Sequence, residues 1–351
     1  MKTFIKWPGG KDSELVKIRE KLPKFSGRYV EPFVGGGAVF FDITSKEYFI
    51  NDKSNDLISL YKCVKNKDLD FYIAIKKYYS SFRSIDDFID NNVELVLNVY
   101  LSKITVSEFL HRICCFFSDK GICCDLLEQE IEKNLKSKIE RSILLEYSKG
   151  QISDVDRVSN IEAALKSAYY MYVRHLYNGD QKLSEGHRAA LFFFIREYCY
   201  SSMFRYNKKG EFNVPYGGIS YNRKDFQKKI SYIESDKIRT KLSKTQIYNE
   251  DFEKFVEKLN LCSDDFMFLD PPYDTDFSTY DQNCFDKEDQ KRLASMLKKT
   301  KAKFMLVIKN TEFIYDLYKD NFNISSFDKK YQVSFKNRNE KQVRHLLITN
   351  Y

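Results

Sequence analysis

The sequence lacks several features that mark common protein classes. No apolar run approaches the roughly 20 residues that a membrane-spanning helix needs. Residues 1–11 contain neither an apolar stretch nor a small-residue cleavage site, so we predict no secretory signal and expect a cytoplasmic protein. Histidine is scarce, with four in 351 residues, and this favours chemistry that needs no histidine base.

Cysteine spacing does not favour a metal centre. The chain has eight cysteines, and the only cluster combines Cys114-Cys115 with Cys123-Cys124. Adjacent cysteines project in different directions and rarely reach one ion, and the nearby His111 adds little. We therefore predict buried, reduced thiols and no metal site.

Positive charge is concentrated in two segments of a chain whose net charge is +8. Residues 203–244 carry eleven Lys or Arg against four Asp or Glu, and residues 328–345 carry six against two. The rest of the chain is slightly acidic. This distribution predicts a polyanion held at a defined surface, with a lysine-rich solvated surface as the alternative.

Residues 266–273 combine an apolar run with a rigid polar exit. The run predicts a short buried strand, and Asp270-Pro271-Pro272-Tyr273 ends it because prolines can neither donate ladder hydrogen bonds nor enter a helix. In open α/β sheets, ligands bind beyond the carboxyl ends of the strands. A proline-stiffened turn with a capping Asp is the alternative interpretation.

The composition of this exit suits a reaction at the exocyclic amine of a nucleobase. Such an amine is a weak nucleophile, so a catalyst must accept hydrogen bonds from its two N–H groups. The Asp270 carboxylate and a carbonyl freed by the two prolines can accept them. Tyr273 can stack on a base that has been extruded from the helix.

A glycine turn predicts a nucleoside cofactor. Residues 29–41 indicate a strand, a turn of three glycines and a helix, which lets the backbone approach a ligand closely. The dinucleotide fingerprint needs a further glycine where Phe40 stands, which argues against NAD and leaves a smaller nucleoside-type cofactor open. Residues 48–52 predict a second strand that ends in Asp52, the position where ribose hydroxyls are held.

The only tryptophan, Trp7, lies beside a Pro-Gly turn. It is either a core anchor or a wall for a planar or cationic ligand, with Lys11 on a carboxylate.

Five blocks of this sequence resemble the Dam-type DNA adenine-N6 methyltransferases, the α-group enzymes of the D12 class, and occur in that family's order. The blocks are Lys6-Trp7-Pro8-Gly9-Gly10-Lys11, Glu31-Pro32-Phe33-Val34-Gly35-Gly36-Gly37, Asn51-Asp52 with residues 56–61, Arg205-Tyr206-Asn207 with residues 210–215, and Asp270-Pro271-Pro272-Tyr273. The resemblance covers residues 1–62 and 189–351 and lapses between them.

This resemblance implies an α/β fold, in which a Rossmann-like, S-adenosylmethionine-dependent methyltransferase sheet carries an inserted, mainly helical target-recognition domain. It assigns S-adenosylmethionine to Trp7, Lys11, Phe33, Gly35, Gly37, Asp52 on the ribose, Asp251 on the adenine amine and Phe252 on the adenine ring. It assigns catalysis to Asp270, Pro271, Pro272 and Tyr273, with no metal.

A glycine-centred hairpin at residues 205–217 is predicted to contact DNA. Cations and aromatic rings crowd it, which suits insertion into a duplex and contact with phosphates. The family commonly has an apolar residue and an arginine where Lys208 and Lys209 stand, and lysine cannot make arginine's planar bidentate contact, so the usual GATC target is not predicted. The predicted DNA-binding residues are Arg205, Tyr206, Asn207, Lys208, Lys209, Asn213, Pro215, Asn337 and Arg338.

Helices are predicted for the middle of the chain. Apolar residues recur every four positions from Leu127 to Ile143, residues 93–117 would supply the packing partner, and residues 148–153 form the loop. The helical pattern resumes at residues 161–177 and 188–203.

We expect a catalytic domain at residues 1–62 and 245–351 and a recognition domain at residues 63–244. An extra helical insertion at about residues 85–160 would serve as scaffold, as a DNA-wrapping surface or as a protein interface.

These observations predict a site-specific DNA adenine-N6 methyltransferase that binds duplex DNA, flips one adenine and transfers a methyl group by direct displacement. Two alternatives stay open. The same acceptors would serve a cytosine-N4 enzyme, and the fold could carry a DNA-binding regulator without turnover. Double-stranded DNA is the expected partner, a cognate restriction endonuclease is a second candidate, and a bacterial, phage or plasmid-encoded type is expected.

Overall fold

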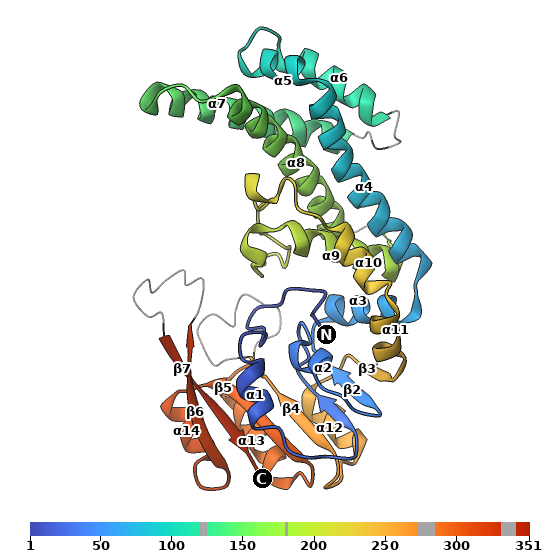
Figure 1. Ribbon diagram of the computed structural model, residues 1–351, viewed down its shortest axis with the longest axis vertical. Coiled ribbons are helices and arrows are strands. Elements are labelled where there is room, and N and C mark those ends of the chain that lie inside the picture. Colours follow the sequence, from blue (N-terminus) through green and yellow to red (C-terminus); the bar gives the residue numbers. More distant parts are fainter. Residues whose placement is uncertain (119–121, 123–124, 180–181, 273–284, 331–341) are drawn as a thin grey trace. The chain divides into compact units, whose positions relative to one another are not determined.

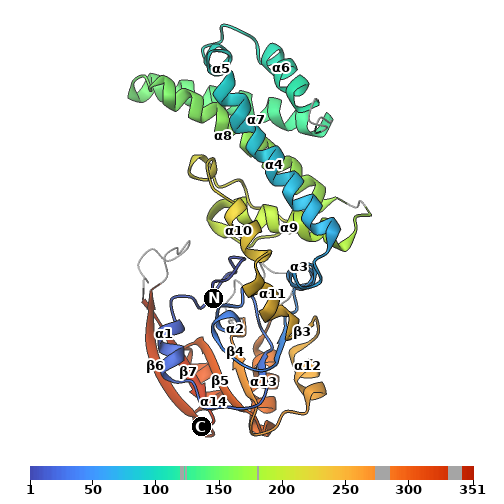
Figure 2. The ribbon, with the colours of Figure 1, turned by 45° about the vertical axis from the view of Figure 1, so that its right-hand side comes forward.

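The computed structural model describes residues 1–118, 122, 125–179, 182–272, 285–330 and 342–351. The chain divides into two compact units, one formed by Met1–Asn66 with Ile233–Tyr351 and the other by Lys67–Tyr232. These boundaries lie a few residues from those expected at one junction and about twelve at the other. Figures 1 and 2 show a sheet with helices in the first unit and helices in the second.

The first unit is built on a seven-stranded sheet in the order β3-β2-β1-β4-β5-β7-β6. Strands β1 to β5 are parallel, and β7 is antiparallel to both of its neighbours. The strands are β1 Tyr29–Glu31, β2 Tyr48–Asn51, β3 Thr245–Tyr248, β4 Phe266–Leu269, β5 Lys303–Lys309, β6 Asn323–Lys330 and β7 Gln342–Thr349.

The sheet confirms the predicted α/β class. Alternate strand residues point to opposite faces of the sheet. Val30 and Met267 join a core with α12, α13 and α14, whereas Tyr29 contacts Tyr48, which packs against Phe40 of α2. The helices of this unit are α1 Leu15–Glu20, α2 Ala38–Asp42, α3 Asn55–Asn66, α11 Asp236–Ser243, α12 Phe252–Leu259, α13 Lys287–Lys299 and α14 Glu312–Tyr318.

Strand β6 was not predicted. It is an edge strand whose described side chains are exposed or half-buried, so its sequence has no continuous apolar run to mark it. Pairing with β7, and not local sequence, makes it a strand.

The second unit is helical, as predicted. Its elements are α4 Leu69–Asn91, α5 Val93–Tyr100, α6 Val106–Ser118, α7 Asp125–Lys149, α8 Asp154–Asn178, α9 Glu185–Tyr198, the 3-10 turns Tyr200–Ser202 and Ile219–Tyr221, and most of α10 Gln227–Ile233. Helix α7 packs most extensively against α8 and less against α6, so the predicted partner segment was only part of its packing (Figures 1 and 2).

Two boundaries differ from the predictions for this unit. The helix predicted to reach residue 203 ends at Tyr198, because the backbone of Cys199 is extended, with φ of -69° and ψ of 148°; Ser201 and Ser202 beyond it are left-handed. The insertion predicted to begin near residue 85 has no boundary there, because α4 runs through that position.

In the described part of the chain, no helix is long and apolar enough to cross a membrane. No group of three or more His, Cys, Asp or Glu side chains in it could hold a metal ion. Cys115 is exposed, so the prediction of buried thiols is wrong there, and Cys123 and Cys124 lie outside the described residues.

Candidate active site and nucleic-acid interface

The glycine turn after β1 packs against the N-terminal tryptophan. Gly35 and Gly37 have φ of 48° and 74°, which side chains other than glycine rarely adopt. A Cβ atom on Gly35 would lie 2.7 Å from Cδ1 of Trp7. The tight approach of the indole therefore requires glycine at position 35.

Two consecutive residues at the end of β2 hold this turn. The Asp52 carboxylate accepts hydrogen bonds from Gly35 N at 2.9 Å and Ser54 N at 2.9 Å. The buried Asn51 side chain donates to the carbonyls of Pro32, at 3.0 Å, and Glu250, at 3.1 Å. The carboxyl ends of β1, β2 and β3 are therefore joined through one side chain.

The residues assigned to the cofactor's adenine lie at the start of α12. Asp251 caps this helix by accepting from Glu253 N at 3.1 Å, and it pairs with Arg292 at 2.8 Å. Burial alone would raise the pKa of Asp251, but the hydrogen bond and charge of Arg292 hold it below its usual range.

Three aromatic rings surround this position. The rings of Phe33 and Phe252 are 5.4 Å apart, and Phe285 contacts both at 5.6 Å. The Arg292 guanidinium lies 4.9 Å from the Phe252 ring. Phe285 and Arg292 were not predicted, because neither belongs to a sequence block with a recognisable pattern.

The N-terminal glycine block meets the polar exit of β4 through an ion pair. Nζ of Lys11 lies 2.6 Å from Oδ1 of Asp270 and also donates to Gly9 O at 2.9 Å. The lysine side chain is 2% exposed and that of Asp270 is 21% exposed. Lys11, assigned to the cofactor, therefore also orients the carboxylate assigned to catalysis.

A glutamine that was not predicted holds the proline pair. Nε2 of Gln290, on α13, donates to Pro272 O at 3.0 Å, and the side chain is fully buried. Prolines have no N–H, so neither Pro271 nor Pro272 can act as a backbone donor, and here a side chain of α13 supplies the donor. Pro271 is buried and Pro272 exposed, and Tyr273 lies outside the described residues.

A buried acid lies close to the same exit. Glu31, at the end of β1, accepts from Tyr29 Oη at 2.6 Å. Burial raises the pKa of Glu31 well above its usual range; the hydrogen bond from Tyr29 opposes this, and the charge of Asp270 raises it further. Nζ of Lys241 lies 3.6 Å from the Tyr48 ring centre, and burial lowers the pKa of Lys241 to about 7.

In the second unit, the segment predicted to contact DNA forms a hairpin with one bridge, between Tyr206 and Phe212. Asn207 builds its turn, since Oδ1 accepts from Lys209 N at 2.9 Å and Glu211 N at 3.0 Å. Lys208 and Lys209 are exposed at the tip.

The return arm of this hairpin alternates between buried and exposed side chains. Asn213 and Pro215 are exposed, whereas Phe212, Val214 and Tyr216 are buried. Arg205 donates through Nε to Asn213 O at 3.0 Å and so joins the two arms. Asn337 and Arg338 lie outside the described residues.

Much of the positive charge predicted to face a polyanion is neutralised within the protein. Lys241 is buried, and five other cations of residues 203–244 form ion pairs. These five are Arg223 with Asp90, Lys224 with Glu197, Lys228 with Asp225, Lys229 with Glu197 and Arg239 with Asp236. Lys208 and Lys209 are the exposed lysines on the hairpin itself.

The strand order, with polar side chains collected beyond the carboxyl ends of parallel strands, defines a Rossmann-like α/β methyltransferase. Comparison with known families then gives a narrower assignment. The model of the D12 class N6 adenine-specific DNA methyltransferases matches residues 7–118 and 118–333, and the chain belongs to this family.

Curated relatives agree with this family, and two of them align over the whole chain. Type II methyltransferase M.MjaIII of Methanocaldococcus jannaschii is 30% identical over 370 aligned positions, covering 100% of this chain and 99% of the relative. Type II methyltransferase M.CviBI of Paramecium bursaria Chlorella virus NC1A is 26% identical, with full coverage of both chains. DNA adenine methylase of Escherichia coli K12 is 25% identical over 84% of this chain and 75% of its own length.

These matches confirm the prediction of an adenine-specific DNA methyltransferase and do not favour the cytosine-N4 and regulator alternatives. They also correct one expectation. Similarity does not lapse between residues 63 and 188, because both the family model and full-length relatives cover that segment.

Proposed function

We propose that the protein binds duplex DNA at a defined sequence, flips one adenine and transfers a methyl group from S-adenosylmethionine to N6. The observation that carries this proposal is the 2.6 Å pair between Lys11 and Asp270. It brings the N-terminal glycine block and the polar exit of β4 into one site, although 259 positions separate them in sequence.

The residues at the glycine turn fit this cofactor. Glycine at position 35 lets the Trp7 indole lie against the turn, where the ring can form a wall for a planar or cationic ligand. A carboxylate has about four acceptor positions, so Asp52 can accept ribose hydroxyls besides its two backbone donors. The residues that would hold the cofactor are Trp7, Lys11, Phe33, Gly35, Gly37, Asp52, Asp251 and Phe252. When bound, S-adenosylmethionine supplies an electrophilic methyl group on a sulfonium.

The polar exit of β4 would supply the acceptors for the target amine. Asp270 accepts from one N–H group while Lys11 fixes the orientation of the carboxylate. Gln290 takes one of the two acceptor positions of Pro272 O, so we assign the second acceptor to the other proline carbonyl, that of Pro271. The stacking role of Tyr273 stays a prediction.

The hairpin would contact the duplex. Its exposed side chains include Lys208 and Lys209 at the tip and Asn213 and Pro215 on the return arm. Lysine ammonium groups suit phosphates, whereas an exposed asparagine can bond base edges. The roles of Asn337 and Arg338, a cytoplasmic location and a partner endonuclease stay predictions.

The test is methyl transfer to duplex DNA from S-adenosylmethionine with an isotope label in the methyl group, followed by digestion to nucleosides and mass spectrometry. We expect label in N6-methyladenine at one sequence. Label in N4-methylcytosine would overturn the assignment of the target base. Retention of DNA binding without any label would indicate a regulator.

A further inference from the structure

Helix α8 carries one row of polar side chains that form hydrogen bonds or ion pairs with the hairpin and with the segment after it. Its members recur every four residues, so each lies next to the following one in a single inclined row along the helix. We call this row the α8 stripe, and it consists of Glu162, Lys166, Tyr170, Arg174 and Asn178.

The C-terminal part of the α8 stripe bonds the return arm of the hairpin. Asn178 donates through Nδ2 to Phe212 O at 3.0 Å and accepts from Phe212 N at 2.9 Å. Val214 O accepts from Tyr170 Oη at 2.8 Å and from Arg174 Nη1 at 3.2 Å. Side chains of α8 thus form hydrogen bonds with the backbone of the return arm, as the backbone of a neighbouring strand would.

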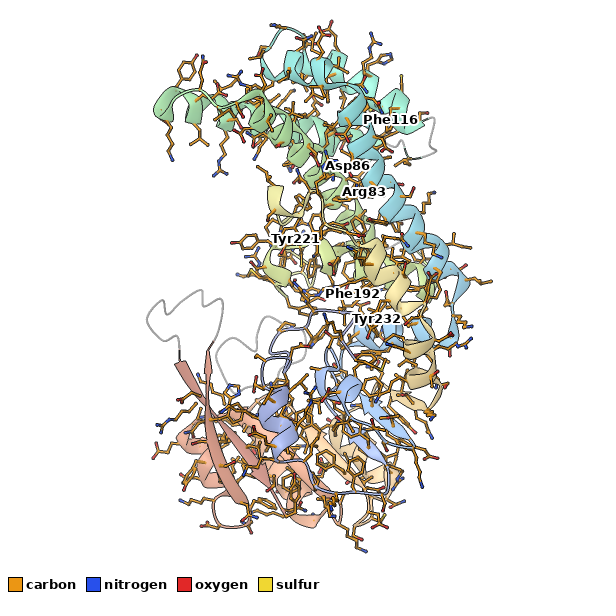
Figure 3. The ribbon with its side chains drawn as sticks, viewed as in Figure 1. Arg83, Asp86, Phe116, Phe192, Tyr221 and Tyr232 are labelled. Atoms are coloured by element: carbon orange, nitrogen blue, oxygen red, sulfur yellow. The ribbon has the colours of Figure 1, made fainter. Side chains whose placement is uncertain are left out.

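The N-terminal part of the stripe bonds the chain beyond the hairpin. Lys166 is fully buried and donates to Asn222 O, and Glu162 lies 3.3 Å from Arg223 Nε. Lys166 also pairs with Asp86 of α4. Asp86 is labelled in Figure 3 beside Arg83, and these two side chains pair at 2.7 Å.

The return arm needs support from α8 because few backbone hydrogen bonds join the two arms of the hairpin. Two backbone hydrogen bonds join its arms: Asn213 N donates to Arg205 O at 2.8 Å, and Asn207 N donates to Glu211 O at 2.9 Å. Phe212 and Val214 alternate with these residues and bond α8 instead. A two-stranded hairpin alone is marginally stable in water. The base of the return arm is held by Tyr200 N, which donates to Pro215 O at 2.8 Å, and α8 holds the part nearer the tip.

We propose that the α8 stripe is a positioning device for sequence specificity, which fixes the hairpin so that its exposed side chains meet DNA in one arrangement. The inference rests on the proposed function of the hairpin. It also gives the helical middle of the chain a role, because α8 packs against α7 while its stripe holds the hairpin.

The test compares variants of the stripe with a control on the same helix. Asn178→Ala removes both bonds to Phe212, and Tyr170→Phe removes one hydroxyl. Ser167→Ala is the matched control, because Ser167 Oγ donates to Asn134 Oδ1 of α7 at 2.9 Å and does not bond the hairpin.

The substrates are duplexes with a fixed central adenine inside a randomised window, and sequencing of the methylated fraction identifies the preferred site. The measured quantity is the ratio of kcat/KM between that site and its single-base variants. We expect this ratio to fall roughly 10-fold in Asn178→Ala and about 3-fold in Tyr170→Phe. Ser167→Ala should keep the parental ratio, and all three should bind S-adenosylmethionine with parental affinity.

Folded Asn178→Ala and Tyr170→Phe proteins with the parental ratio would overturn the proposal, as would a lowered melting temperature without a change in the ratio. If Asn178→Ala does not fold, Tyr170→Phe decides, since it alters a single hydroxyl. The role of the hairpin has its own test, the double variant Lys208→Ala with Lys209→Ala. Unchanged DNA affinity, salt dependence and preferred site in that variant would refute the proposed role of the hairpin.

Discussion

Replacement of Asp270 separates catalysis from stability, because its carboxylate is assigned to both. Asp270→Asn keeps the shape of the side chain and an oxygen that can accept from Lys11, but it removes the negative charge. Loss of one preorganised partner for a developing charge typically costs ~10²–10³ in turnover, and we expect a loss in this range. The melting temperature should fall less than in Asp270→Ala, because the amide oxygen still accepts from the Lys11 ammonium although the opposite charge is lost.

Asp270→Ala should behave differently, because it leaves the Lys11 ammonium without the carboxylate in a place where the lysine is 2% exposed. Breaking a fully buried pair by removing one partner costs ~3–5 kcal/mol. Asp270 is 21% exposed, so water can replace part of its contact, and we expect about 2–3 kcal/mol. For a domain of this size that corresponds to a fall in melting temperature of roughly 5–10 °C.

The double variant Lys11→Met with Asp270→Ala distinguishes the two effects. Methionine tolerates burial, so the double variant should recover most of the stability that Asp270→Ala loses. It should not recover turnover, because the acceptor for the amine is still missing.

The assays are single-turnover methyl transfer with DNA and cofactor both saturating, and thermal unfolding of each variant. An Asp270→Asn protein that transfers methyl at nearly the parental rate would refute the catalytic role of the carboxylate. Equal melting temperatures for Asp270→Asn and Asp270→Ala would refute the argument from the buried ammonium.

Four other changes have defined outcomes. Asp52→Ala should weaken binding of S-adenosylmethionine by about tenfold or more with DNA affinity nearly unchanged, as measured by calorimetry, because charged acceptors are removed from the cofactor side of the site. Alanine at Lys208 or at Lys209 should weaken binding to all duplexes alike and flatten the salt dependence by about one unit of slope each; a changed target sequence would instead show that the residue contacts bases. Gln290→Glu removes the donor to Pro272 O, so kcat should fall about tenfold at pH 8. The value of kcat should recover as the pH is lowered, because a protonated carboxyl can donate again, and a loss that does not vary with pH would contradict this. Lys241 has its pKa lowered to about 7 in the folded state, so the unfolded state binds more protons between pH 7 and 10.5 and the free energy of unfolding should rise with pH over that window. The rise is up to about 1.4 kcal/mol per pH unit, and urea unfolding of Lys241→Met should lack it.

Local sequence was sufficient for the strands that carry the site. Short apolar runs mark β1, β2, β4 and β5, and an acid follows the run at or just beyond the end of β1, β2 and β4, because these signals act between neighbours in the chain. The alternation of buried and exposed side chains from Phe212 to Tyr216 is likewise visible in the sequence.

Local patterns were not sufficient where polar side chains have long-range partners. The stripe of α8 has the spacing of an ordinary solvated helix face, and only folding shows that its members bond the backbone at residues 212–222. The basic segment at residues 203–244 likewise indicated an open cationic surface, whereas several of its charges are paired with acids.

The sequence by itself determined the family, the parallel strands and the order of the motifs, because each depends on short-range chemistry that a linear reading preserves. The tertiary structure decided which of those motifs meet. Lys11 and Asp270 form a pair across 259 positions, Asn51 joins three strand ends, and Gln290 of α13 donates to Pro272 O across 18 positions. A polar group that is buried loses its hydrogen bonds to water and needs a partner within the protein. The folded chain, and not the neighbouring sequence, decides which partner lies within reach.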